Sequence, residues 1–348
     1  MNSKLSHILA LSGEAALFIE QGRIVYCNAG AERLLGPCLG RQAAELLGAE
    51  YSASHARAFV LSMPLQGAPY LLRVNRLEEG RLVFLQKQEE APIILNDPFL
   101  YSLRSNLMTL GMAADKLRPA AEDLRQKGMQ EDLTSLTSSA FKLMRLSENV
   151  SLVRDLFLHR AAASPVELDL ALLCHSVLDA AEDAFPALSF RRELPDTLRL
   201  SADPKLLKLL LFNLLSPALI HARPTLIQLR LRENGDRVLL SVGDNGCGIP
   251  AEALSTVFER YRFDFGLSQM GRGAGLGLSA ARAVAQLHGG TLLLESREDQ
   301  GTLVQASLSR GGTATRVQMD SDLCSMRDLL LGLADCLPLR CFEGKYLD

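Results

Sequence analysis

The sequence predicts a multidomain α+β protein with four parts: an α/β unit over residues 1–90, a helical hairpin over 91–162, an α/β sandwich over 163–310, and a linker with an amphipathic tail helix over 311–348. Three observations carry this prediction. Alternating apolar residues around tight-turn signals occur twice in the first part, as in β-hairpins. Leucines at three- and four-residue steps fill the second part. Two glycine-rich turns interrupt the strands and helices of the third part.

The composition excludes several classes of protein. A net charge of −3 without a basic block argues against nucleic acid as a partner. The seven cysteines form no CxxC pair, and their odd number favours neither a zinc site nor a disulfide framework. The N-terminus lacks a signal peptide's apolar core, and the most apolar run, 206–220, is too short to span a bilayer. We therefore expect a cytoplasmic protein without a membrane span.

Two hairpins frame the first part. Their tight turns are predicted at Gln21-Gly22 and at Glu79-Gly80, and a short helix follows the first hairpin. The predicted elements are strands at 16–20 and 23–27, a helix at 28–35, and strands at 68–76 and 81–86.

Leucine stripes define the second part. Asp97 and Pro98 are a good cap and a good first-turn residue for one helix, and Pro119 is expected to end it. A second stripe covers 133–157. Neither helix can bury its stripe alone, so we expect two chains to form a dimeric four-helix bundle through 97–160. The alternative is a hairpin that packs on the other domains of its own chain. The seam residues are Leu100, Leu103, Leu107, Leu110, Ala114, Leu117, Leu133, Leu136, Ala140, Leu143, Leu146, Val150, Val153 and Phe157.

Strands and helices alternate in the third part. Asp203-Pro204 predicts a helix start, and Asn234-Gly235 predicts a tight hairpin turn. The predicted helices are 167–184, 205–221 and 278–287, and the predicted strands are 188–193, 198–201, 226–233, 237–242, 291–297 and 302–308.

The two glycine turns point to a phosphate-containing ligand. Glycines at this spacing leave backbone N–H groups uncovered, and a helix that starts there directs its positive end toward the loop. Asp244 in the first turn could accept a hydrogen bond from an exocyclic amine. Together these features predict a site for a purine nucleotide triphosphate. The turn residues are Asp244, Gly246 and Gly248 in the first turn, and Gly273, Gly275 and Gly277 in the second.

Longer motifs resemble known families. The stretch LFIEQGRIVYCNAGAERLLG (17–36) resembles the opening of a PAS sensor domain. The order of a PAS-like unit, a helical hairpin and an α/β domain with two glycine boxes resembles a bacterial sensor histidine kinase. In that family the α/β domain is an ATPase-type domain shared with gyrase and heat-shock chaperones. The resemblance covers residues 10–310, and its specific motifs lie within 203–308.

The resemblance assigns roles to single residues. DNGCGIP resembles the first glycine box, so Asp244 would bind the adenine amino group. VFERYRF resembles the phenylalanine box and places Phe258 at the base of a lid. GRGAGLGL resembles the second glycine box, which wraps the phosphates and ends at Leu278. Thr302 would lie near the adenine. Asn213 is the first residue of the stretch that resembles the family's asparagine box.

Two positions depart from the family pattern. LYSLRSNL (100–107) fits the register of the phosphoacceptor helix, but Tyr101 stands where the histidine should be. Tyr101 follows a seam residue and is expected to face solvent. The run NLLSPA places Pro217 where the family has an Mg²⁺-holding asparagine. Asn213 or Ser216 could partly substitute, and His221 or Arg223 could contact a phosphate. We expect ATP to bind and Mg²⁺ to be held poorly.

Three functions remain open at this point. The first is a dimeric signalling protein that binds ATP and regulates a response regulator or another kinase as a pseudokinase. The second is an active kinase that phosphorylates Tyr101 or a partner. The third is a non-enzymatic dimeric scaffold. The tail helix predicted at 323–337 could dock on its own chain or on a partner, and packing on its own chain is the simpler interpretation.

Overall fold

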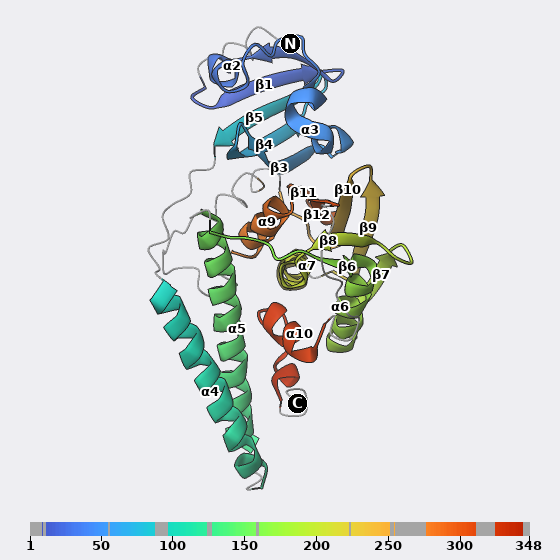
Figure 1. Cartoon of the computed structure of the whole chain (residues 1–348). Coiled ribbons are helices and arrows are strands. Elements are labelled where there is room, and N and C mark those ends of the chain that lie inside the picture. Colours follow the sequence, from blue (N-terminus) through green and yellow to red (C-terminus); the bar gives the residue numbers. More distant parts are fainter. Residues whose placement is uncertain are drawn as a thin grey trace.

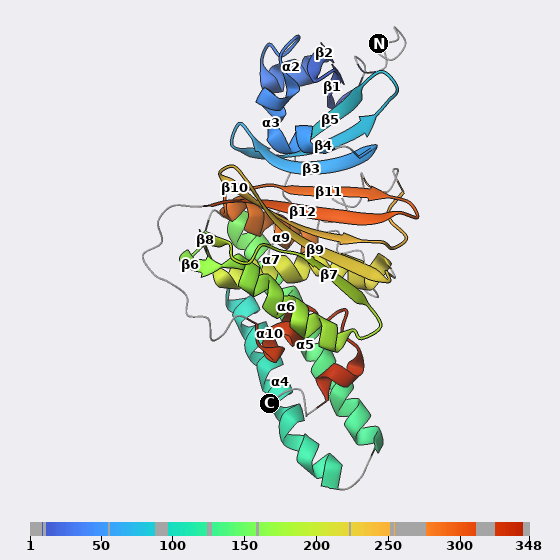
Figure 2. The same ribbon diagram turned by 90° about the vertical axis from the view of Figure 1, so that its right-hand side faces the viewer.

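One ten-stranded sheet joins the first and third parts of the chain, and two long helices extend away from it (Figures 1 and 2). The structure is a computed structural model. It describes Leu9 and residues 12–54, 56–87, 97–123, 127–157, 160–222, 224–250, 254, 276–310 and 324–343.

The described residues of the N-terminal unit form five strands, with the sheet order β2-β1-β5-β4-β3, and the helices α2 and α3. The two predicted hairpins and the first helix are confirmed. Helix α3 and strand β3 were not predicted, because Gly48 at φ 80° interrupts the helix and Pro64 lies within the strand. The elements are β1 (Ala15–Glu20), β2 (Arg23–Cys27), α2 (Ala29–Leu35), α3 (Ala43–Ala53), β3 (Ala58–Leu65), β4 (Ala68–Arg76) and β5 (Arg81–Lys87).

Strand β3 pairs antiparallel with β11 (Leu292–Arg297), which makes the sheet continuous. Leu61 lies opposite Leu293. Since successive side chains of a strand point to opposite faces, each unit contributes to the core of the other. Leu293 packs in the N-terminal cluster, while Val60 and Leu71 pack in the cluster of the third part. The two units therefore share their cores at the junction.

Shortening Leu293 to alanine is expected to loosen this junction. The side chain is 4% exposed, and a buried Leu→Ala change costs about 2–5 kcal/mol of stability. We expect a lower midpoint of urea unfolding and faster tryptic release of the N-terminal unit. Leu39→Ala is the control, because Leu39 is 66% exposed and should leave both measurements unchanged. An unchanged midpoint for Leu293→Ala would contradict the shared core.

The helical hairpin consists of α4 (Asp97–Asp123) and α5 (Lys127–Phe157). The prediction that Pro119 ends the first helix is wrong, because α4 continues to Asp123. A proline removes one main-chain hydrogen bond and crowds the preceding turn. Here it lies in the last turns of the helix and is exposed, where this cost is most easily tolerated.

The seam residues of the hairpin differ in burial, and two sets of four show the difference. Leu107, Ala114, Leu133 and Ala140 are buried. Part of this burial arises within the hairpin itself, because Ala114 of α4 packs against Leu133 of α5. The second group is 42–55% exposed within the single chain and consists of Leu110, Leu117, Leu136 and Leu143.

The third part places its main helices on one face of the sheet (Figure 2). Its nine-residue strand β9 and eight-residue strand β10 form the hairpin predicted across Asn234-Gly235. The prediction of one helix over 167–184 is wrong at its start, because Asp169 caps α6 and the preceding residues form a strand. The elements are β6 (Val166–Asp169), α6 (Leu170–Ala184), β7 (Ser189–Glu193), β8 (Arg199–Ala202), α7 (Pro204–Pro217), β9 (Leu226–Asn234), β10 (Arg237–Asp244), α9 (Gly277–Leu287), β11 and β12 (Gly301–Ser309).

The tail helix is shorter than the sequence suggests. Ser325 and Asp328 form a capping box that starts α10 (Met326–Gly332), and a 3-10 turn, η4 (Leu339–Phe342), follows. The helix ends at Gly332, before position 337 where it was predicted to end. The apolar positions Leu329, Leu330 and Leu333 are buried. The tail packs against α5, α6 and α7 of its own chain.

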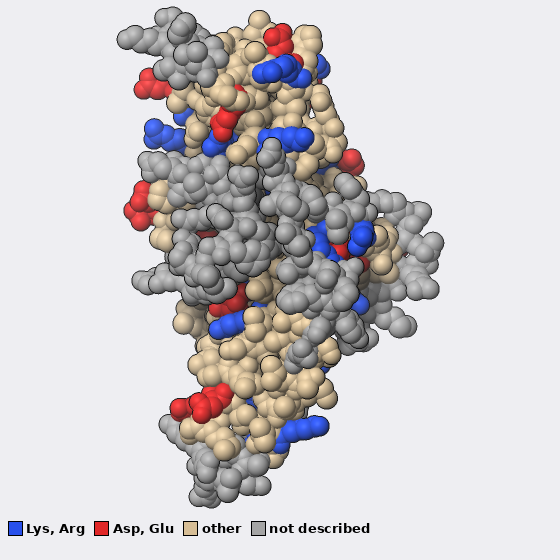
Figure 3. Space-filling model, turned by 90° about the vertical axis from the view of Figure 1, so that its left-hand side faces the viewer, with Lys and Arg blue, Asp and Glu red and all other residues tan. Residues whose placement is uncertain are grey.

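The surface carries both signs of charge. On the face shown in Figure 3, the described Lys and Arg side chains lie interspersed with Asp and Glu, without a patch of one sign among them. This distribution is the one expected from the sequence, which has no basic block. Among the described residues, no helix combines the length and apolar character that a membrane crossing requires.

Candidate functional site

Asp244 ends strand β10 and lies half-buried between two turns. Its carboxylate accepts hydrogen bonds from the backbone N–H of Gly246, at 2.8 Å, and from that of Thr302. Burial raises the pKa of Asp244 above its ordinary value, and these two N–H donors only partly oppose the rise. The carboxylate is therefore positioned but only partly solvated, as expected of a group that binds a ligand.

Two glycines let the surrounding turns approach this aspartate. Gly301 has φ 92°, and a Cβ there would lie 1.8 Å from the carbonyl oxygen of Asp244. Gly248 has φ 64°, and its Cβ would lie 1.9 Å from the carbonyl oxygen of Arg297. Only glycine fits at either position, because the backbone is left-handed there and a Cβ would collide with the neighbouring carbonyl oxygen. The first glycine box is thus packed directly on the turn between β11 and β12.

Ser296 braces the same turn, a role that the sequence did not suggest. Its Oγ accepts from the backbone N–H of Ile249 at 2.8 Å and lies 2.9 Å from the hydroxyl of Thr302. It also donates to the carbonyl of Gly301 at 3.0 Å. A lone serine at the end of a strand carries no sequence signal, because its three partners lie at least five residues away.

A cavity of about 1260 Å³ opens at Asp244 and Thr302. Its volume is ample for a nucleotide-sized ligand. One wall comes from the turns of the third part. The opposite wall comes from residues 56–58 and 75–78 of the N-terminal unit, which the β3–β11 pairing brings to this edge of the sheet. The sequence did not predict that second wall, since it depends on a contact between distant segments.

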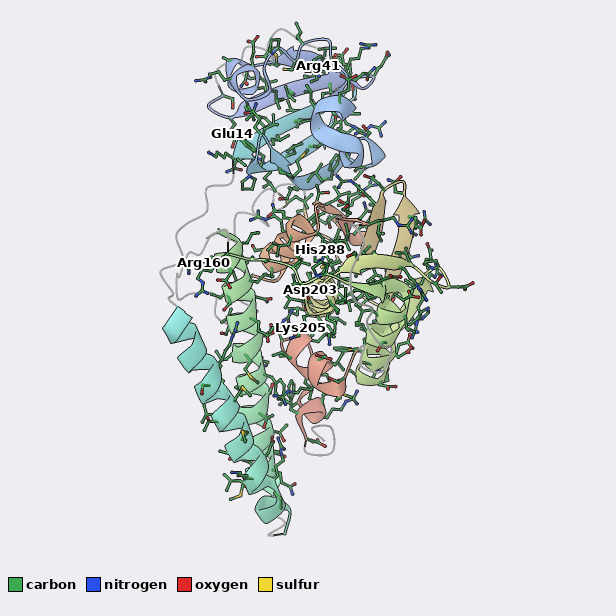
Figure 4. The ribbon with its side chains drawn as sticks, viewed as in Figure 1. Glu14, Arg41, Arg160, Asp203, Lys205 and His288 are labelled. Carbon is green, nitrogen blue, oxygen red and sulfur yellow. The ribbon has the colours of Figure 1, made fainter. Side chains whose placement is uncertain are left out.

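Helix α7 is anchored to α9 at its start. Asp203 caps α7 through the backbone N–H groups of Lys205, at 2.9 Å, and Leu206, at 3.2 Å. The backbone N–H of Asp203 donates to Nε2 of His288, just after α9, at 3.2 Å. Figure 4 labels Asp203, Lys205 and His288 at this junction. The Asp-Pro start predicted from the sequence is confirmed.

The asparagine box lies against the start of α9. Asn213 is buried, and a Cβ at Gly277 would lie 2.9 Å from its Oδ1. Gly277 is the first residue of α9, and Leu278 behind it is buried in the core. The described residues provide no side-chain cap at this helix start, and the start of a helix favours an anion. Phe258, Gly273 and Gly275 fall outside the described residues.

Asn213 is also held by the helical hairpin. Its Oδ1 accepts from Nη2 of Arg145 at 3.0 Å, and its Nδ2 donates to Oδ1 of Asn149 at 3.0 Å. Arg145 bonds the hydroxyl of Ser216 and, through Nη1, pairs with Asp335 of the tail at 3.0 Å. Arg145 and Asn149 were not predicted as site residues, since an arginine and an asparagine on a long polar helix look solvated.

The two positions that the sequence comparison marks as departures, Tyr101 and Pro217, both lie on helices. Pro217 is the last residue of α7, and the chain widens into a π-helical turn, η1 (Ala218–Ala222), directly after it. A proline cannot donate to the carbonyl of Asn213, which agrees with this change of helix type. Tyr101 lies on α4, and its side chain falls outside the description. So do the side chains of His221 and Arg223, two of the nearby basic residues.

Comparisons with known proteins agree with this arrangement. The chain is similar to histidine protein kinase DivJ of Caulobacter vibrioides, with 37% identity over 42% of this chain and 27% of that protein. It is similar to adaptive-response sensory kinase SasA of Synechocystis sp., with 30% identity over 58% of this chain and 55% of that protein. Residues 202–311 match the family described as histidine kinase-, DNA gyrase B-, and HSP90-like ATPase. The chain belongs to the bacterial sensor histidine kinases.

This sensor histidine kinase carries the site in its ATPase domain. Asp244, Thr302, Asn213 and Gly277 all lie within the matched residues, whereas Arg145 comes from outside them. The chain spans about a quarter to a half of the lengths of these curated relatives. Among solved structures, the ATP binding domain of PrrB from Mycobacterium tuberculosis is 30% identical, covers 43% of this chain and 98% of that chain, and has a TM-score of 0.34.

Proposed function

We propose that this sensor histidine kinase binds ATP and acts in two-component signal transduction as a regulator, without efficient phosphoryl transfer of its own. The cavity at Asp244 carries the proposal. Its half-buried carboxylate is held by main-chain N–H groups and is suited to accept a hydrogen bond from the adenine amine. The start of α9 at Gly277 favours the negative charge of the phosphates.

Two residues support the loss of phosphoryl transfer. Tyr101 stands at the phosphoacceptor position, and a phenol with an ordinary pKa of about 10 is not a nucleophile at neutral pH as a neutral imidazole is. Pro217 stands at a metal-holding position and has no side-chain oxygen. Phosphoryl transfer depends on metal and positioning, so we expect transfer to be lost before binding is.

The other parts of the chain complete the proposal. Residues 1–90 would act as a PAS-like sensor, and their two hairpins with a helix between them support this assignment. Residues 97–160 would pair with a second copy into a four-helix bundle. The four exposed seam leucines support pairing, because large apolar side chains gathered on a surface often mark a contact with another protein. The partner would be a response regulator or another kinase.

Parallel binding and transfer measurements test this proposal. Purified full chain is titrated with a fluorescent ATP analogue and is separately incubated with γ-labelled ATP and Mg²⁺. We expect saturable binding and no label on the protein. Label that disappears in Tyr101→Phe and persists in the control Tyr70→Phe would instead establish an active kinase. Absence of binding, unchanged in Asp244→Ala, would favour the scaffold.

A further inference from the structure

Arg145 lies where α5 meets α7, in a fully bonded polar cluster. The cluster consists of Arg145, Asn149, Asn213, Ser216 and Asp335. The first four are buried, with exposed fractions of 1–5%. A buried guanidinium is costly unless it is paired and bonded, and this one is both. Its position is therefore well defined.

The side-chain oxygens of α7 that could bind a metal ion already take part in hydrogen bonds. Asn213 Oδ1 has two acceptor positions, and it receives Nη2 of Arg145 at 3.0 Å and Nδ2 of Asn149 at 3.5 Å. The hydroxyl of Ser216 accepts from Arg145 and donates to the carbonyl of Phe212 at 2.7 Å. An arginine offers only donors, so it requires the Asn213 oxygen to face it.

Mg²⁺ does not fit this cluster. The ion requires near-octahedral oxygen ligands at close range, and a guanidinium already occupies the hydrogen-bonding space of both oxygens. Its positive charge would also repel a cation. Pro217, one residue further along α7, adds no oxygen. Among the described residues, no group of three His, Cys, Asp or Glu side chains lies close enough to hold a metal elsewhere.

We infer that Arg145 occupies the place of the divalent cation and that the ATPase domain binds nucleotide without Mg²⁺. The inference rests on the proposed function, since it concerns the same site. The cluster adjoins Gly277, whose Cβ would lie 2.9 Å from Asn213 Oδ1, and is thus next to the helix start that favours phosphates. Arg145 belongs to α5, so the helical hairpin and, through Asp335, the tail both take part in the nucleotide site.

The wild-type chain provides the first test. Affinity for a fluorescent ATP analogue is measured in EDTA and in excess Mg²⁺. We expect the two dissociation constants to agree within about threefold, a difference of less than 1 kcal/mol. Affinity that rises tenfold or more with Mg²⁺ would overturn the inference and leave the proposed function standing. No binding in either solution would overturn both.

Three variants isolate the role of Arg145. Pro217→Asn alone restores an oxygen, yet Arg145 still holds Asn213, so we expect binding to stay independent of Mg²⁺. Combining it with Arg145→Met frees both side chains and should tighten binding in Mg²⁺ by about tenfold or more relative to EDTA. Lys142→Met, an exposed change on the same helix, is the matched control. Mg²⁺-dependent binding by Pro217→Asn alone would contradict the role of Arg145. Circular dichroism establishes that each variant is folded.

Discussion

Replacing Asp244 with asparagine is expected to weaken nucleotide binding about 30-fold, or by about 2 kcal/mol. The change keeps the shape of the side chain and removes its charge, so the adenine amine loses a charged acceptor. An amide could also turn its own donors toward that amine. Titration with a fluorescent ATP analogue measures the loss. Asp236→Asn, in the turn at the opposite end of β10, is the matched control and should bind as the wild type does.

The pH dependence of nucleotide binding is a second test of the role of Asp244. The ionised carboxylate accepts from the adenine amine more strongly than the protonated acid does, so wild-type affinity is highest above the pKa of Asp244 and falls as pH drops through it. Because burial raises that pKa, the loss should begin at a higher pH than for an ordinary aspartate. Asp244→Asn should show no such dependence over the same range. Equal affinities and equal pH profiles would remove Asp244 from the site.

Replacing Gly332 with alanine is expected to destabilise the fold by about 3 kcal/mol. Gly332 ends α10, and a Cβ there would lie 2.0 Å from Cδ2 of Phe212 in α7. Phe212 is itself buried, so its ring cannot move aside without disturbing the core. We expect a lower midpoint of urea unfolding, and displacement of the tail would also remove Asp335 from Arg145.

The matched control is Gly111→Ala in α4. A Cβ at Gly111 meets nothing within 4 Å, and alanine is the better helix former by about 0.5–1 kcal/mol. This variant should therefore unfold at the same midpoint or a slightly higher one. If Gly332→Ala behaved like this control, the tail would not pack against α7.

Local patterns were sufficient to predict most of the ATPase domain. Strand alternation placed β9 and β10 on either side of Asn234-Gly235, and this alternation depends on residues that are neighbours in sequence. Of the two turns that meet at Asp244, one follows β10 and the other joins β11 to β12. The resemblance added that Thr302 would lie near the same aspartate, and the hydrogen bond between them agrees with it.

Helix ends were less predictable than helix positions. A proline was expected to stop α4 at Pro119, yet packing and a position near the end allow the helix to continue. At Pro217 the same residue type changes α7 into a π-helical turn. The local cost of a proline is similar in both places. Whether a helix continues past the proline depends on the tertiary packing around that helix, which cannot be read from the sequence.

The sequence by itself determined the first glycine turn and the hairpin at Asn234-Gly235. It also predicted the four parts of this sensor histidine kinase and the departures from the family pattern at Tyr101 and Pro217. Only the tertiary structure decided that the N-terminal sheet continues into the ATPase sheet through β3 and β11. It also decided that Arg145 binds the side chain of Asn213. The reason is the same for both findings. The β3 edge and the buried guanidinium of Arg145 are stabilised by partners 68 or more residues away, and no local pattern of charge or apolar residues identifies such partners.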